Sequence, residues 1–100
     1  MEQAIRGAIT QLGVTTWRGK HREAITELES FCDGANSELL QFSAEVTPAV
    51  RSCLCGNKDT LLRLLRKLSQ RRANYTTSDM IEEFFRLATC SDKKSFSRAA

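Results

Sequence analysis

Apolar residues recur three and four positions apart along most of this chain, which is the spacing of one face of an α-helix. The sequence has only one proline and five glycines. No stretch alternates apolar and polar residues between turn-forming residues, as a half-buried strand would. We therefore expect an all-α protein.

The longest apolar pattern covers residues 17–46 and keeps one angular phase throughout, within a stripe roughly 80° wide. Its members are Trp17, His21, Ala24, Leu28, Phe31, Ala35, Leu39, Phe42 and Val46. The constant phase predicts one continuous helix of roughly 45 Å. The alternative is a break near Asp33 and Gly34, with Asn36 or Ser37 as the N-cap of a second helix.

A stripe this narrow is typical of a coiled-coil seam, and a helix this long exceeds what one compact domain of this size needs. We therefore expect a second copy of the chain to cover the stripe. The residues predicted to form this homodimer seam are Trp17, Leu28, Phe31, Leu39, Phe42 and Val46.

Two shorter apolar patterns flank the long one. The first predicts an opening helix that Gly13 ends in the left-handed conformation, with Thr15 or Thr16 as the N-cap of the long helix. The second predicts a short helix from Pro48 to about Cys55, because proline favours the first helical position.

The last part of the chain predicts two further helices. Asn57 is a good N-cap for a helix over residues 58–72, whose five leucines lie on one face. Thr77 or Ser78 is expected to cap a last helix that ends near Thr89. We assign residues 1–90 to one helical domain and residues 91–100 to a flexible basic tail.

The four cysteines, Cys32, Cys53, Cys55 and Cys90, lie within apolar helical patterns, which predicts buried free thiols in a reducing compartment. Cys53 and Cys55 are two residues apart on a helix and so point to opposite sides. With a single histidine, the chain lacks a ligand set for zinc. We expect no metal, no cofactor and no enzymatic activity.

Charge changes this picture, because it is distributed in blocks. Residues 23–50 carry six acids and no base, whereas residues 51–72 carry a net charge of +6. Such blocks suggest a polyanionic partner or charge-complementary self-association. Two basic clusters are candidate phosphate contacts, with ordinary solvated side chains as the alternative: Arg18, Lys20 and Arg22, and Arg63, Arg66 and Lys67.

The order of elements, with a basic turn, a long amphipathic helix, a proline break and a short helix closed by glycine, resembles the RNA-silencing suppressor of insect nodaviruses. The matching positions are Arg22, Ile25, Leu28, Phe31, Cys32, Thr47, Pro48, Ala49, Val50, Leu54, Cys55, Gly56 and Lys58. The resemblance covers about two-fifths of the chain.

The resemblance implies a homodimer in which the long and first helices form a four-helix bundle that binds double-stranded RNA independently of sequence. Binding would shield the duplex from dicing and from small-interfering-RNA loading in the host cytoplasm, where host silencing proteins are further expected partners. By position, Arg22, Lys20 and Lys58 would contact RNA. An RNA-binding face would also have to recruit residues outside the matched pattern, namely Arg18, Arg63, Arg66 and Lys67. The family's basic residues along the middle of the long helix are acids here, so those contacts do not transfer.

Two alternatives remain open. One is a helical protein–protein interaction module, a death-fold-like bundle or an adaptor, without nucleic-acid binding. The other is a basic amphipathic helix over residues 58–72 that lies on an anionic membrane. The sequence has no apolar run of membrane-spanning length and no signal-type segment, so we expect a cytoplasmic protein without membrane association.

Overall fold

A computed structural model describes residues 2–34, 47–70 and 74–90. These residues form five helices and no strand, which confirms the predicted all-α class. The helices are α1 (Glu2–Trp17), α2 (His21–Cys32), α3 (Pro48–Gly56), α4 (Lys58–Ser69) and α5 (Thr77–Leu87).

Helix α1 is longer than predicted, because it continues through Gly13 to Trp17. Gly13 does not end the helix. It allows α1 to approach α5 closely, since a Cβ atom at this position would lie 2.7 Å from the Cγ2 atom of Thr77. The turn comes later, at Gly19, whose φ of +84° is a conformation that glycine adopts at little cost. Thr15 and Thr16 are buried within α1 and do not cap α2.

The predicted continuous helix over residues 17–46 is wrong. Helix α2 has only 12 residues, about 18 Å, and Trp17 belongs to the preceding helix. Asp33 is its C-cap, and Gly34 follows with a φ of +84°. One break therefore falls where the alternative placed it, and the turn at Gly19 is a second break that neither prediction included. Asn36 and Ser37 lie outside the described residues, as do Leu39, Phe42 and Val46.

The stripe of α2 is covered within its own chain. Ala24 and Leu28 are fully buried and Phe31 is 4% exposed, whereas Trp17 is 57% exposed. Because these side chains already pack in the core, the argument that a narrow stripe needs a second copy no longer holds for α2. A homodimer and its four-helix bundle stay predictions.

Helices α3 and α4 begin as the sequence predicts. Pro48 occupies the first turn of α3, and the Thr47 hydroxyl accepts a hydrogen bond from the Val50 N–H. Asn57 holds the N-cap position of α4, but its side chain makes no capping hydrogen bond. Helix α4 ends at Ser69, with Gln70 as its C-cap, so the expected end near residue 72 is wrong.

Helix α5 begins one or two residues earlier than the predicted caps, Thr77 or Ser78, imply. Thr76, and neither Thr77 nor Ser78, is the N-cap, and it forms a capping box with Asp79. The Thr76 hydroxyl accepts from the Asp79 N–H at 3.1 Å, and the Asp79 carboxylate accepts from the Thr76 N–H at 2.9 Å. The helix ends at Leu87, two residues before the predicted Thr89. The basic tail, residues 91–100, lies outside the described residues.

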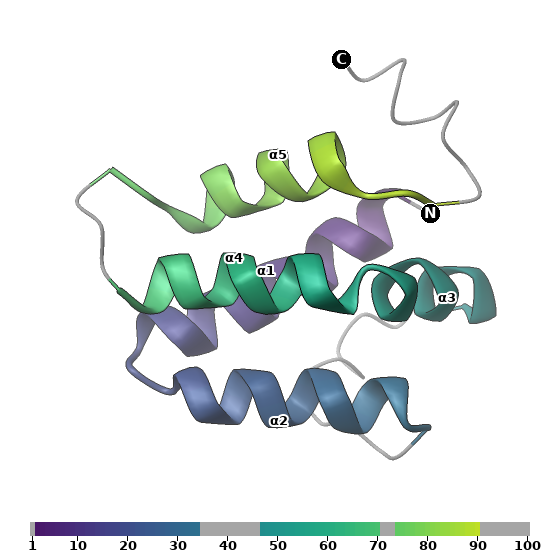
Figure 1. Ribbon diagram of the computed structural model, residues 1–100, viewed down its shortest axis with the longest axis horizontal. Helices are drawn as coiled ribbons and strands as arrows, with labels where there is room; N and C mark the ends of the chain where they lie inside the picture. The colour runs from purple at the N-terminus through teal and green to yellow at the C-terminus, as the bar shows by residue number, and fades with distance from the viewer. Residues whose placement is uncertain (1, 35–46, 71–73, 91–100) are drawn as a thin grey trace.

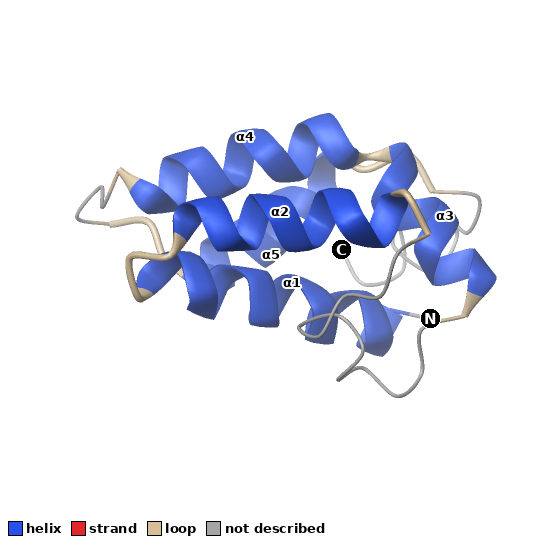
Figure 2. Cartoon of the chain, turned by 90° about the horizontal axis from the view of Figure 1, so that it is seen from below, coloured by secondary structure: helices blue, strands red, loops and turns tan. Residues whose placement is uncertain are grey.

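Helix α1 packs against α2, α4 and α5. Figure 1 shows α4 in front of α1, with α5 along one side and α2 along the other, and Figure 2 shows α2 between α4 and α1. The largest fully buried side chains are Ile5, Ile9, Leu12, Leu28, Leu54, Leu61, Leu64, Leu65, Leu68, Met80 and Phe84.

The prediction of free thiols is wrong, because all four cysteines form disulfides. Cys32 pairs with Cys55 and Cys53 pairs with Cys90, with Cα–Cα distances of 5.3 and 5.0 Å. The prediction that Cys53 and Cys55 point to opposite sides is confirmed, since one reaches the end of α2 and the other the segment after α5. Sequence patterns could not show the pairing, because each disulfide joins residues that are 23 or 37 positions apart in the chain.

Candidate functional site

The two basic clusters lie at the same end of the bundle. Helices α2 and α4 run antiparallel side by side, so the start of α2 lies beside the end of α4 (Figures 1 and 2). The ion pair between Lys58 Nζ and Glu29 Oε2, at 3.7 Å, shows which residues of the two helices lie side by side. From this pair, Arg66 lies about 12 Å further along α4 and Arg22 about 10 Å back along α2. This alignment places Arg66 opposite the first turn of α2.

We define the basic surface as Arg18, Lys20, Arg22, Arg63 and Arg66. All five side chains are exposed. The start of α2 supplies one part of the surface because the turn at Gly19 brings the chain back after α1, and α4 supplies the other because its leucines occupy the opposite face. Arg22 and Arg63 are 41 positions apart in the sequence, so it is tertiary packing that brings the two basic clusters together.

The cations of this surface are largely available to a partner. Among the described residues, Arg18, Arg22, Arg63 and Arg66 form no ion pair. Lys20 has only an exposed contact of 3.9 Å with Glu23. Exposed pairs of this kind contribute little to stability, so a partner can replace them at small cost.

Lys67 and Lys58, by contrast, are engaged within the fold. Lys67 Nζ donates to Glu83 Oε1 at 3.0 Å and lies 5.9 Å from the centre of the Tyr75 ring. This hydrogen bond holds the pKa of Glu83 below its usual value, whereas burial and the bond to Glu83 raise the pKa of Tyr75. Lys58 pairs with Glu29 at the opposite end of α2. The structure therefore does not group these two lysines with the basic surface as free phosphate contacts.

Burial tests the alternative in which residues 58–72 lie on a membrane. The leucines of α4, including Leu61, Leu64 and Leu65, are fully buried in the bundle, so this helix does not present them to a membrane. No helix in the described ranges is both long and apolar enough to cross a membrane.

Trp17 belongs to a different helix from the one that the sequence pattern predicted. It lies at the end of α1, next to Arg18 of the basic surface, and is 57% exposed, and its place in a dimer seam stays a prediction. The apolar spacing assigned Trp17 to the long predicted helix, because spacing alone does not show where one helix ends and the next begins.

Comparison of the chain with protein-family models, with curated proteins and with solved structures gives no match.

Proposed function

We propose that this protein is a helical protein-interaction module that acts by binding alone and recognises an acidic protein surface through its basic surface. The observation that carries the proposal is the position of Arg66 opposite the first turn of α2, which joins two basic clusters into one exposed surface. Arginine suits this role because its planar guanidinium binds carboxylates in a bidentate geometry.

The charges around this surface favour a protein over a phosphate backbone. Glu23 directly follows Arg22 on α2 and lies 3.9 Å from Lys20 of the basic surface. A regular row of phosphates would be repelled by this carboxylate, whereas a protein can place a base opposite an acid and an acid opposite a base. Mixed charge of this kind also selects one partner and one orientation.

Charge reversal at Arg66 tests the proposal, with Arg86 as a matched control. Each arginine is exposed and lies in the last turn of its helix, so Arg66→Glu and Arg86→Glu disturb the helix dipole alike, and Arg86→Glu in addition removes an exposed contact of 3.6 Å with Glu83. The full chain would first capture partners from a nuclease-treated extract. The affinity for each purified partner would then be measured across a range of salt concentrations.

We expect Arg66→Glu to weaken partner binding by about tenfold or more and Arg86→Glu to change it by less than about twofold. The affinity of the unchanged protein should fall as salt rises. Equal effects of the two reversals would contradict the proposal.

Sequence-independent binding of double-stranded RNA is the second candidate function. The meeting of Arg22, Arg63 and Arg66 on one surface favours it, because recognition of A-form RNA rests on phosphate and ribose contacts. A homodimer would double this surface, and suppression of RNA silencing would follow from covering the duplex. The support that the long helix gave to this resemblance is gone.

A gel shift with a perfect RNA duplex at low salt tests the second candidate. Binding at micromolar protein that ignores sequence and weakens steeply with salt would support it. Sedimentation of the free protein at tens of micromolar tests the homodimer. The absence of a shift with every duplex would remove the RNA candidate and leave the first proposal standing.

A further inference from the structure

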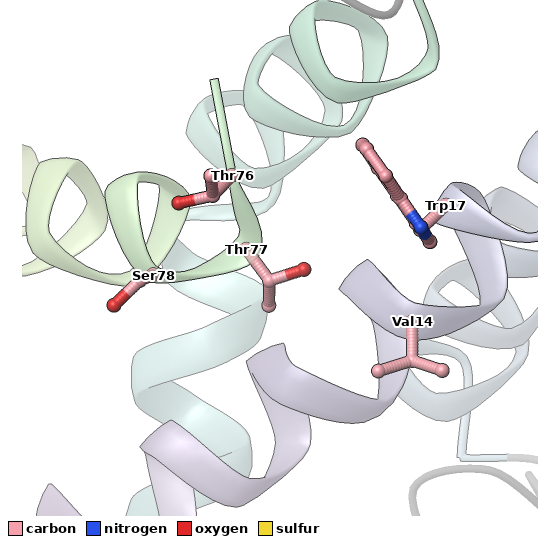
Figure 3. A pocket seen from close by; sticks show the side chains of 5 residues that line it. All are labelled: Val14, Trp17, Thr76, Thr77 and Ser78. Atoms are coloured by element: carbon pink, nitrogen blue, oxygen red, sulfur yellow. The ribbon is translucent and has the colours of Figure 1, made fainter. Parts of the chain in front are cut away.

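The end of the bundle that carries the basic surface also contains an apolar pocket. The pocket, of about 310 Å³, lies between the end of α1 and the start of α5 and is lined by Val14, Trp17, Thr76, Thr77 and Ser78. In Figure 3, the Thr77 side chain projects toward the helix that carries Val14 and Trp17. We infer that this pocket receives one bulky apolar side chain from an acidic segment of the protein partner. The inference rests on the proposed function.

The walls of the pocket fit an apolar side chain. Its surface is mostly apolar, and Val14 and Trp17 are 37% and 57% exposed, so both lose water contact when the pocket is filled. Tryptophan is among the residues that contribute most often to binding energy at protein interfaces. The close approach of Thr77 to Gly13 fixes the separation of the two helices beside the pocket.

The surrounding charge identifies the kind of segment. Arg18 directly follows Trp17, and the other cations of the basic surface lie at the same end of the bundle. A segment whose apolar side chain enters the pocket beside Trp17 therefore places a neighbouring residue near Arg18, with the other cations at the same end of the bundle. Carboxylates at those positions are the complementary choice. The occupant to which these features point is an acidic segment with one apolar anchor.

Trp17 is the chain's only tryptophan, so its fluorescence reports the pocket directly. The probes are two short peptides rich in glutamate and aspartate that differ only at the central residue, leucine in one and alanine in the other. We expect the leucine peptide to shift the Trp17 emission to shorter wavelength and to bind about tenfold or more tightly than the alanine peptide.

Val14 and Leu87 provide a matched pair of variants. Both are apolar, both are 37% exposed, and they lie at opposite ends of the bundle, on α1 and α5 (Figure 1). Val14→Ser is expected to remove most of the preference for leucine, and Leu87→Ser to keep it. Circular dichroism of each variant verifies that the fold is retained.

Several outcomes would overturn the inference. If the two peptides bind equally tightly and Arg66→Glu weakens the binding of both, the pocket does not bind the central side chain, whereas the proposed function is supported. If neither peptide binds, the pocket inference fails, and the proposed function is judged by capture with Arg66→Glu and Arg86→Glu. If Trp17 emission shifts with protein concentration alone, the occupant is a second copy. A shift of the Trp17 emission when residues 91–100 are deleted would show that the C-terminal segment of the chain itself occupies the pocket.

Discussion

The side-chain oxygen of Asn57 accepts a hydrogen bond from the backbone N–H of Thr89 at 2.9 Å. The amide nitrogen of the same side chain donates to the carbonyl oxygen of Cys53 at 2.7 Å. Asn57 is 6% exposed. Because both ends of its side chain are paired inside the protein, Asn57 connects the junction of α3 and α4 to the segment that follows α5.

Asn57→Ala should lower the free energy of unfolding by about 1 to 3 kcal/mol, because it leaves the buried Cys53 carbonyl without its side-chain donor and removes the bond to the Thr89 N–H. Urea denaturation followed by circular dichroism measures the loss. Asn74→Ala, at an exposed position, is the control and should have little effect. Similar losses in the two variants would show that the Asn57 side chain is not the connection described.

Gly13→Ala should destabilise the protein by about 1 to 3 kcal/mol, because the added Cβ atom would lie 2.7 Å from Thr77 Cγ2 and force α1 and α5 apart. Gly56→Ala is the control, since a Cβ at that helical position meets nothing within 4 Å. Adding Thr77→Ala to Gly13→Ala should restore part of the loss. A Gly13 variant as stable as the Gly56 variant would contradict the close packing.

Gly19→Ala should cost about 1 to 2 kcal/mol, although a Cβ at Gly19 meets nothing within 4 Å. The cost comes from the backbone, whose φ of +84° disfavours residues with a side chain. Thermal or urea unfolding measures it, and Gly19→Asn should be milder because asparagine tolerates this conformation better. A continuous helix through residue 19 would give the opposite sign, since alanine stabilises a helix interior relative to glycine.

Acid should remove the stability contributed by Glu83. The hydrogen bond from Lys67 lowers the pKa of Glu83 from an ordinary value of 4.5, so the folded protein binds this proton more weakly than the unfolded chain. The stability that ionised Glu83 contributes is fully present above its ordinary pKa, and it is lost as the pH falls through the pKa that Glu83 has in the folded protein. Between about pH 6 and about pH 3, the unchanged protein should lose more stability than Glu83→Gln. Glu82→Gln, on the neighbouring exposed carboxylate, should follow the unchanged protein.

Reduction should destabilise the protein strongly. One disulfide joins residues that are 23 positions apart and the other joins residues that are 37 positions apart. Closing a loop of this size lowers the entropy of the unfolded chain, and each disulfide thereby stabilises the folded state by about 3 to 4 kcal/mol. Urea unfolding with and without a thiol reductant measures the difference. A variant with serine at all four cysteine positions should not respond to the reductant. Equal stability of the unchanged protein in both conditions would contradict the pairing.

Local chemistry predicted several elements well. Thr47 and Pro48 specify the start of α3, and the leucines of α4 identify a buried face, because capping and amphipathic spacing depend on residues close in sequence. The same reasoning failed at Gly13 and Gly19. A glycine permits a turn but does not require one, and only the approach of Thr77 decides that Gly13 stays helical.

The candidate surface was predictable only in parts. Both basic clusters were visible as sequence, but their union depends on the antiparallel alignment of α2 and α4, which no local pattern contains. The stripe that suggested a seam continues in phase past Trp17 and into α2, although the chain turns between them. Angular phase can agree by coincidence across a short break, so it does not prove continuity.

The positions of Cys53 and Cys55 bear on the order of events when the chain folds in oxidising conditions. Four thiols can join in three ways, and in an unstructured chain the two nearest ones meet most often. Once α3 has formed, its turn separates the two sulfur atoms and each faces a different distant thiol. Oxidation after helix formation therefore leads to the native connectivity, whereas oxidation in strong denaturant should enrich the wrong link within α3.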